Sequence, residues 1–114
     1  MTFQPGSDLS RSEVEERVER AIEDNEVVLF MKGTKLMPQC GFSRRALDLL
    51  SRHRDDVETV DVLESLPEYR AALAERSDWE TIPQTFVDGE FIGGSDILLE
   101  LEERDELAAT LEAE

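Results

Sequence analysis

The sequence predicts an α/β fold in which helices cover both faces of a four-stranded mixed sheet. Three observations support this prediction. Short apolar runs alternate along the chain with amphipathic runs of helical length. The first half contains a strand–helix–strand pattern, whose two strands normally pair in parallel. An Asp-Gly pair at 88–89 then joins two further strand patterns into an antiparallel hairpin.

Two helices and a buried strand are expected in the first half of the chain. Residues 10–24 open with a capping signature from Ser10 to Glu13, and their apolar side chains recur at helical spacing. The run Val27–Met31 is short, apolar and β-branched at its start, which is typical of a strand buried on both faces of a sheet. A further amphipathic stripe predicts a second helix over residues 41–53.

The second half supplies the remaining strands and helices. The run 57–62 predicts a second strand, and residues 65–76, with a capping-box start and a proline in the first turn, predict a third helix. After the hairpin at 84–92, a Gly-Gly pair ends the last strand, and Ser95 or Asp96 caps a final helical region that has a polar interruption. This order of elements is that of a thioredoxin-like fold.

We expect a flexible arm over residues 1–9 followed by one domain over residues 10–114. A chain of 114 residues can bury a core without disulfides or metal. Its single cysteine excludes an intrachain disulfide and therefore a secreted disulfide scaffold. No run is long and apolar enough to span a bilayer, and no basic-then-apolar leader opens the chain, so we expect a cytoplasmic protein without membrane contact.

The chain is strongly acidic, with 28 acidic against 12 basic residues, a net charge of −16 and only two lysines. Such a surface stays hydrated at very high salt, so a halophilic source is our hypothesis, and an ordinary acidic cytosolic protein is the alternative. Nucleic-acid binding is not expected in either case. The segment 32–54 reverses the trend, with six basic residues against Asp48 alone. It suggests an anionic ligand or partner, the alternative being arginines on a solvated helix face.

The cysteine, Cys40, ends a loop that leads from the apolar strand into the second helix. The first N–H groups of a helix have no intrahelical partner and the helix dipole is positive there, so a sulfur at this position is stabilised as a thiolate. Lys32, at the mouth of the loop, adds a positive charge. The alternative is a buried inert thiol, which is common for free cysteine. The position between Pro38 and Gly41 at a helix start favours the thiolate.

A single cysteine restricts the chemistry of the site. Position 43 is serine, so Cys40 lacks a C-x-x-C partner and dithiol exchange needs a thiol from elsewhere. Cys40 and the distant His53 are too few for a tetrahedral metal site within one chain. An iron–sulfur cluster needs four thiolates, which two chains and two small-molecule thiols would supply. We interpret His53 as structural or solvated, at the end of its helix.

Other conspicuous residues have both a structural and a ligand-binding interpretation. We expect the aromatic residues Tyr69, Trp79 and Phe91 to pack in the fold. Pro83 opens a strand after Ile82 and is a candidate for a cis peptide bond. The segment 93–96 offers backbone N–H groups and a carboxylate to a ligand, or is a plain turn from strand to helix.

Five segments together resemble a known family. They are Phe30–Thr34, Pro38–Ser43, Trp79–Gln84, Asp88–Glu90 and Gly93–Asp96. In this order and spacing they are similar to the monothiol glutaredoxins of the CGFS type, from about residue 14 to residue 111. This resemblance implies a glutaredoxin domain with a thioredoxin fold.

The resemblance also implies a function. Members of the family bind glutathione and form homodimers that bridge a [2Fe–2S] cluster through one cysteine per chain and two glutathione thiols. They are generally iron–sulfur carriers that serve apo-proteins, with weak glutathione-disulfide reductase activity. Carried over by position, Cys40 is the cluster ligand and the catalytic thiol. The implied thiol-binding residues are Lys32 and Arg70 for a carboxylate, Ile82 through its backbone ahead of a cis Pro83, and Ser95 with Asp96 for the γ-glutamyl end.

Three residues depart from the family pattern. Lys35 replaces a proline of the thiol loop, and Glu80 replaces the proline that usually follows the tryptophan. Ser95 stands where many members have a second cysteine, so no resolving thiol exists within the chain.

Three functions therefore remain open from the sequence. The first is a carrier that holds a [2Fe–2S] cluster in a homodimer bridged by glutathione or another low-molecular-weight thiol and transfers it to apo-proteins. The second is a thiol–disulfide oxidoreductase or deglutathionylase in which Cys40 is the nucleophile. The third is a thioredoxin-like adaptor whose cysteine is incidental. The serines at 43 and 95 favour the first, because neither can resolve a disulfide.

Overall fold

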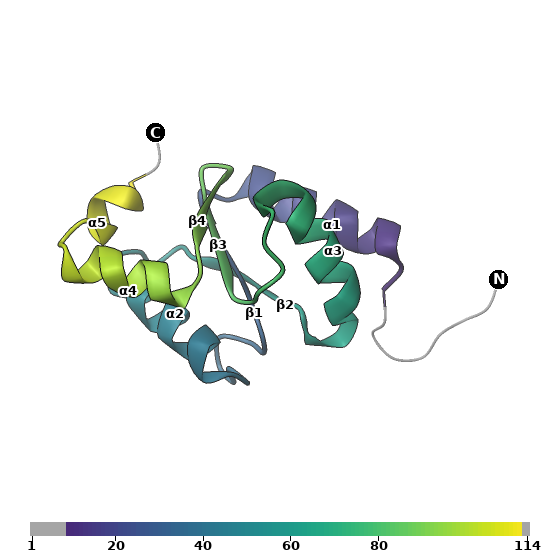
Figure 1. Ribbon diagram of the computed structural model, residues 1–114, viewed down its shortest axis with the longest axis horizontal. Helices are drawn as coiled ribbons and strands as arrows, with labels where there is room; N and C mark the ends of the chain where they lie inside the picture. The colour runs from purple at the N-terminus through teal and green to yellow at the C-terminus, as the bar shows by residue number, and fades with distance from the viewer. Residues whose placement is uncertain (1–8, 113–114) are drawn as a thin grey trace.

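The structure is a computed structural model that describes residues 9–112 (Figure 1). Most of the predicted arm, residues 1–8, lies outside the described residues. The elements in chain order are α1 (Arg11–Asp24), β1 (Val27–Met31), α2 (Gly41–Ser51), β2 (Glu58–Asp61), the short 3₁₀ helix η1 (Leu63–Ser65), α3 (Leu66–Ser77), β3 (Gln84–Val87), β4 (Glu90–Gly93), α4 (Ser95–Glu103) and α5 (Leu107–Thr110).

The sheet has the predicted mixed topology, with strand order β2-β1-β3-β4. β1 pairs in parallel with β2 and antiparallel with β3, and β3 pairs antiparallel with β4. Helices α1 and α3 cover one face, whereas α2, α4 and α5 cover the other (Figure 1). The expected thioredoxin-like arrangement is therefore confirmed. Within residues 9–112, no helix has both the length and the apolar character needed to cross a membrane.

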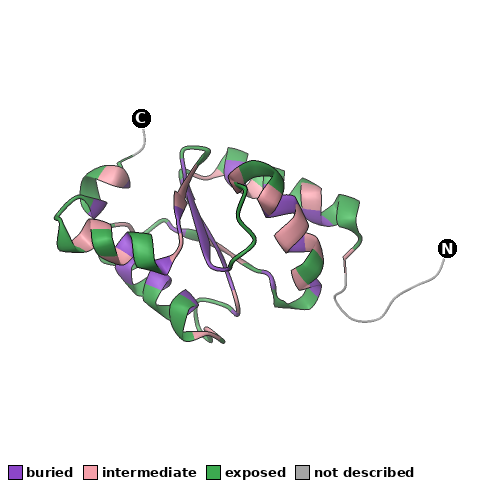
Figure 2. Cartoon of the chain, viewed as in Figure 1, coloured by how far each residue is buried: buried purple, intermediate pink, exposed green. Residues whose placement is uncertain are grey.

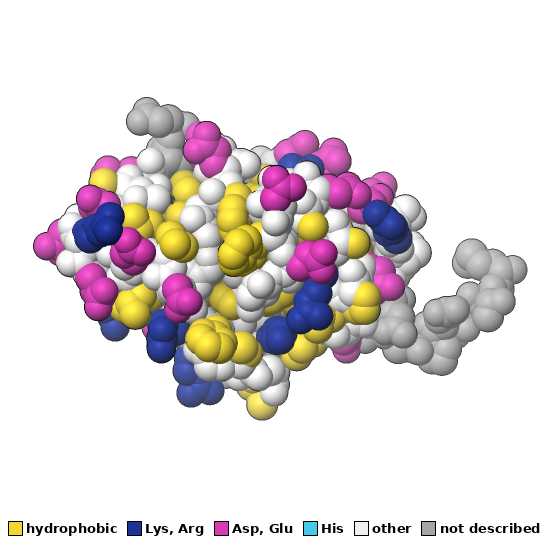
Figure 3. Space-filling model, viewed as in Figure 1, with side chains coloured by type: hydrophobic (Ala, Val, Ile, Leu, Met, Phe, Trp, Pro, Cys, Tyr) yellow, Lys and Arg dark blue, Asp and Glu magenta, His cyan; other side chains and the backbone are white. Residues whose placement is uncertain are grey.

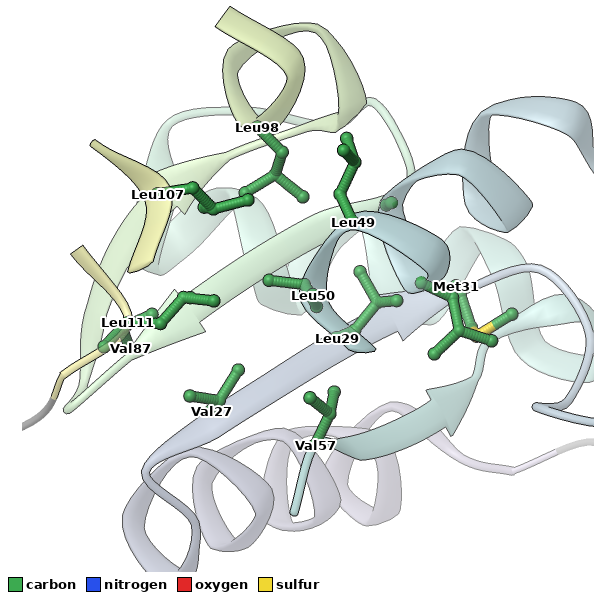
Figure 4. Close-up of a cluster of buried hydrophobic side chains, with 12 residues drawn as sticks. Val27, Leu29, Met31, Leu49, Leu50, Val57, Val87, Leu98, Leu107 and Leu111 are labelled. Atoms are coloured by element: carbon green, nitrogen blue, oxygen red, sulfur yellow. The ribbon is translucent and has the colours of Figure 1, made fainter. Parts of the chain in front are cut away.

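The central strand β1 is buried along its whole length, as its unbroken apolar run predicts (Figure 2). Successive side chains of a strand point to opposite faces of the sheet. Val28 and Phe30 therefore pack under α1 and α3, where the Phe30 and Phe86 rings meet edge to face with centroids 5.8 Å apart. The alternate residues of β1 pack under the other helices, with Leu50, Leu98, Leu107 and Leu111 among their neighbours (Figure 4).

The hairpin between β3 and β4 is confirmed. Asp88 and Gly89 have φ values of 50° and 83°, the positive values that a tight I′ turn requires at both central positions. The capping box of α1 is also present, because the Ser10 hydroxyl accepts from Glu13 N–H while the Glu13 carboxylate accepts from Ser10 N–H.

Two other predicted capping hydrogen bonds are absent, although Ser65 is the N-cap residue of α3. Ser65 makes no capping hydrogen bond for α3, because its hydroxyl instead accepts from Leu9 N–H at 2.8 Å. At the start of α4, the N-cap is Gly94 and neither Ser95 nor Asp96 caps the helix through its side chain. The final helical region is divided into α4 and α5 by Arg104–Glu106, where Asp105 has a positive φ of 59°.

Salt is expected to stabilise this fold. The net charge is −16, and Figure 3 shows acidic side chains over the upper edge and one end of the visible face. Because salt screens repulsion between exposed like charges, we expect the thermal unfolding midpoint to rise by several degrees as KCl is added. Sucrose is the non-ionic comparison, and the rise that it causes by exclusion from the protein surface is subtracted. A midpoint that is constant or falls with KCl would contradict this prediction.

Candidate functional site

The loop between β1 and α2 has a defined, hydrogen-bonded conformation. Gln39 N–H donates to Lys32 O at 2.9 Å, and Gly33 forms an isolated β-bridge with Pro38. The carboxylate of Asp61, at the end of β2, accepts from Gly33 N–H at 3.0 Å. These contacts fix the path of the chain into the first turn of α2.

Gly33 is required by both its conformation and its surroundings. Its φ of +95° is one that side chains with a Cβ rarely adopt. A Cβ at this position would collide with Met37 O and would lie 2.7 Å from Gln39 N. The loop can therefore close only around a glycine.

Cys40 occupies the N-cap of α2 and is partly exposed. Burial of the thiol tends to raise its pKa, but the backbone N–H groups of Ser43 and Phe42, the Ser43 hydroxyl and the charge of Lys32 together lower it below the ordinary value. The side chain makes no capping hydrogen bond of standard geometry. The N–H groups therefore act mainly as dipoles near the sulfur, which favours the thiolate.

Ser43 is fully buried and links the cysteine to the loop. Its hydroxyl oxygen accepts from Lys32 N–H at 3.0 Å, and its hydroxyl also helps to lower the pKa of Cys40. The residue that replaces a second thiol thus supports both the loop backbone and the thiolate.

Replacing Ser43 by alanine should make Cys40 less reactive near neutral pH. The change removes one group that lowers the pKa of Cys40, so the alkylation rate with iodoacetamide should rise only at higher pH than in the parent protein. It also leaves the partly buried Lys32 N–H without its acceptor, which costs roughly 1 kcal/mol of stability. Ser51→Ala, at an exposed position of the same helix, is the control. An unchanged pH profile in Ser43→Ala would refute this role.

A cleft of about 380 Å³ opens beside the thiol. Lys32 and Arg70 lie in its lining together with Cys40 and Ile82. Glu80 lines the same cleft, so an acid that departs from the family pattern lies among the cations. The remaining lining residues are Phe42 and Thr81.

A second cleft of about 360 Å³ continues from the first. Phe42, Thr81 and Ile82 line both. The second cleft extends past Pro83 to Ser95 and Asp96, at the N-terminal end of α4. The two clefts form one groove beside the cysteine, with cations near one end and a carboxylate near the other. Figure 3 shows basic and apolar side chains gathered along the lower edge of the molecule, in contrast to its acidic upper edge.

The wall of the groove is a loop anchored by a buried glutamine. Gln84 Nε2 donates to Trp79 O at 2.6 Å, and Gln84 Oε1 accepts from the Ser77 hydroxyl at 3.0 Å. The Ile82–Pro83 peptide bond within this loop is cis. Trp79 was expected to pack in the fold, but it is 51% exposed and lines the groove, whereas Tyr69 is buried.

The structure brings all the sequence-predicted site residues to this groove. Sequence reasoning missed several contributors, namely Phe42, Thr81 and Trp79 as lining residues, Gln84 and Ser77 as anchors, and Arg45, whose Nη1 lies 3.9 Å from Asp96 Oδ1. The aromatic residues two positions after the cysteine and four before the cis proline were the available signal. The anchors gave none, because the sequence does not show that the Gln84 side chain is buried and turned back toward Ser77 and Trp79.

His53 lies away from the groove. Its Nε2 is 2.7 Å from Glu102 Oε1, and this contact joins the end of α2 to α4, as a structural role predicts. The helix itself ends at Ser51, two residues earlier than predicted. In residues 9–112, no group of three or more histidine, cysteine, aspartate or glutamate side chains is arranged to hold a metal ion.

The chain is similar to known proteins along most of its length. The glutaredoxin family model matches residues 27–92. Over 100 residues, the chain is 48% identical to an uncharacterised monothiol glutaredoxin, ycf64-like, of Synechocystis and 47% identical to the ycf64 monothiol glutaredoxin of Porphyra purpurea, covering 88% of this chain and 92% of each relative. Over 92 residues it is 41% identical to glutaredoxin 4 of Escherichia coli, covering 81% of this chain and 79% of that protein.

A solved structure shows the same fold. The solution structure of reduced poplar apo GrxS14 superposes with a TM-score of 0.75 at 40% sequence identity, over 86% of this chain and 89% of that chain. The extent of these matches, together with a single cysteine at the start of α2, assigns the family. The chain belongs to the monothiol glutaredoxins.

Proposed function

We propose that this monothiol glutaredoxin carries a [2Fe–2S] cluster as a homodimer bridged by a low-molecular-weight thiol such as glutathione, and transfers the cluster to apo-proteins. The observation that supports this most directly is the groove itself. It combines a cysteine of lowered pKa, two cations and no second thiol. A site of this kind is suited to holding an external thiol beside Cys40.

The proposed ligand is a thiol-containing peptide with carboxylates and one ammonium group. Lys32 and Arg70 would hold one carboxylate by charge-assisted hydrogen bonds. The backbone of Ile82, ahead of the cis Pro83, would pair with the peptide backbone of the ligand. At the other end of the groove Asp96 would hold the ammonium group, beside Ser95. This arrangement would bring the ligand sulfur next to Cys40.

The cluster is the cargo of this protein. Cys40 offers one thiolate, and no other cysteine is present in the chain. Two chains would therefore contribute two Cys40 thiolates, and two small-molecule thiols seated in the grooves would complete the four that a [2Fe–2S] cluster requires. Half of these ligands can dissociate, which suits a cluster that is passed on.

Anaerobic reconstitution tests this proposal. Protein given iron and sulfide at high salt should develop visible charge-transfer absorption and double its solution mass only when glutathione is added. Cys40→Ser should do neither, because it removes the protein's thiolate. Ser51→Ala is a matched surface control. A colourless monomer under all conditions would refute the carrier function.

The lowered pKa of Cys40 supports a second function, thiol–disulfide exchange. The Cys40 thiolate would attack the glutathionyl sulfur of a mixed disulfide, forming a Cys40–glutathione disulfide and releasing the substrate thiolate, which takes up a proton. A second glutathione thiolate would then attack, regenerating Cys40 and leaving oxidised glutathione. Steady turnover of a glutathionylated peptide, lost in Cys40→Ser, would support it. Negligible turnover at saturating glutathione would exclude it.

A further inference from the structure

The loop before Cys40 presents two large apolar side chains to solvent. Leu36 is 93% exposed and Met37 is 66% exposed. The loop is nonetheless closed, because Thr34 and Met37 exchange two backbone hydrogen bonds of 3.2 Å and the Thr34 hydroxyl accepts a further one from Met37 N–H. The exposure therefore belongs to the folded conformation of the loop.

Four cations around this loop make no ion pair with an acidic side chain in residues 9–112. They are Lys32, Lys35, Arg44 and Arg70. Ion pairs within the described part of the chain engage Arg11, Arg45, Arg52, Arg54, Arg76 and Arg104, and Arg17 and Arg20 of α1 make none there either. On a chain with 28 acidic residues, the four cations around the thiol loop are available to an anion from outside.

These cations divide into two pairs by position. Lys32 and Arg70 line the cleft beside Cys40, where the proposed function uses them for the thiol carboxylate. Lys35, in the loop, and Arg44, in the first turn of α2, are exposed and outside the lining of both clefts. Together with Leu36 and Met37 they define what we call the docking surface: two apolar and two basic exposed side chains on the chain segments that flank the thiol.

We propose that the docking surface binds the acidic face of the protein that receives the cluster. This inference rests on the proposed carrier function, because transfer requires the acceptor to approach Cys40. Charge complementarity selects the occupant. An acidic acceptor would pair with Lys35 and Arg44, whereas a second copy meeting this surface symmetrically would place like charges of the two chains together.

Transfer at this surface is ligand exchange without electron transfer. Four acceptor cysteines lose their protons and bind the two irons, while two Cys40 thiolates and two small-molecule thiolates leave and are reprotonated. The oxidation state of the cluster is unchanged.

The test follows cluster transfer to an apo plant-type ferredoxin, whose four cysteines bind a [2Fe–2S] cluster. A ferredoxin variant with its surface carboxylates replaced by amides is the neutral probe. We expect Leu36→Ser/Met37→Ser and Lys35→Ala/Arg44→Ala to slow transfer to the acidic acceptor about tenfold, as truncation of interface hot spots does. The loaded mass and absorption should not change. Arg20→Ala, a cation of α1 away from the groove, should transfer normally.

The other results would count against the docking surface or the carrier function. The inference would be overturned if both double variants transferred the cluster at the parental rate. It would also be overturned if they slowed transfer to the neutral ferredoxin as much as transfer to the acidic one. Loss of the doubled mass in either variant would assign the surface to the second copy instead. If the parent protein takes up no cluster, the carrier function fails. The docking surface is then tested alone, by the backbone amide chemical shifts of residues 35–37 on addition of the acidic or the neutral apo-ferredoxin. Shifts of equal size with both ferredoxins, or no shifts with either, would reject the docking surface.

Discussion

Gly33→Ala should unfold the thiol loop and destabilise the protein by about 3–5 kcal/mol, the combined cost of a strained positive φ and of an overpacked site. The added methyl group collides with the backbone of Met37 and Gln39, which is held by the hydrogen bond from Gln39 N–H to Lys32 O. Denaturant unfolding measures the loss. Cys40 should also lose its reactivity toward alkylating reagents at low pH, because the first turn of α2 no longer holds the thiol.

Gly41→Ala is the matched control for this prediction. It adds the same methyl group one residue after Cys40, where the space around the Cβ is open, so its stability should stay within about 0.5 kcal/mol of the parent. If Gly33→Ala is as stable as Gly41→Ala, the loop is not fixed in the conformation described above.

Gln84→Ala should release the wall of the groove and cost about 2–4 kcal/mol, because it removes a fully buried side chain and two of its hydrogen bonds. Trp79 is the only tryptophan and is held through its carbonyl by Gln84, so its fluorescence reports directly on this loop. We expect a red-shifted Trp79 emission and weaker glutathione binding, both at denaturant concentrations below the global unfolding transition.

Thr85→Val distinguishes this effect from general damage to β3. Thr85 is equally buried, but its hydroxyl has no hydrogen-bond partner among the described residues. An apolar side chain of the same shape removes an unsatisfied polar group, so stability should rise by about 0.5–1 kcal/mol with unchanged Trp79 emission. A red shift in Thr85→Val matching that of Gln84→Ala would show that the anchor is not specific.

The fold was predictable because each major element carries its own pattern. The apolar run of β1 fixes its burial on both faces, and the Asp88-Gly89 pair fixes the hairpin. One failure depends on a contact between distant segments. Ser65 has the sequence of a cap, but Leu9, 56 residues away, provides its hydrogen bond instead.

The site was predictable to a different degree at each position. Cys40 and Lys32 could be placed from the loop and helix start, and the segment with Asp96 could be recognised as a possible ligand-binding turn, whereas the role of Arg70 was available only from resemblance. Trp79 lies in a segment without periodicity, so no pattern told whether its ring faces the core or the solvent. The exposure of Trp79 depends on the hydrogen bond from the Gln84 side chain to the Trp79 carbonyl. The sequence does not show that this glutamine is buried, because most glutamines lie on the surface.

The hydrogen bond between Ser43 and Lys32 also bears on how such a protein can evolve. A change to a two-cysteine site by Ser43→Cys would replace a good acceptor with a larger, weaker one at a fully buried position, and the Lys32 N–H would lose its partner. The substitution that adds a second thiol would therefore loosen the loop that presents the first. A stable two-cysteine variant would need a compensating change in the loop, so the supporting structure itself favours the single-thiol state.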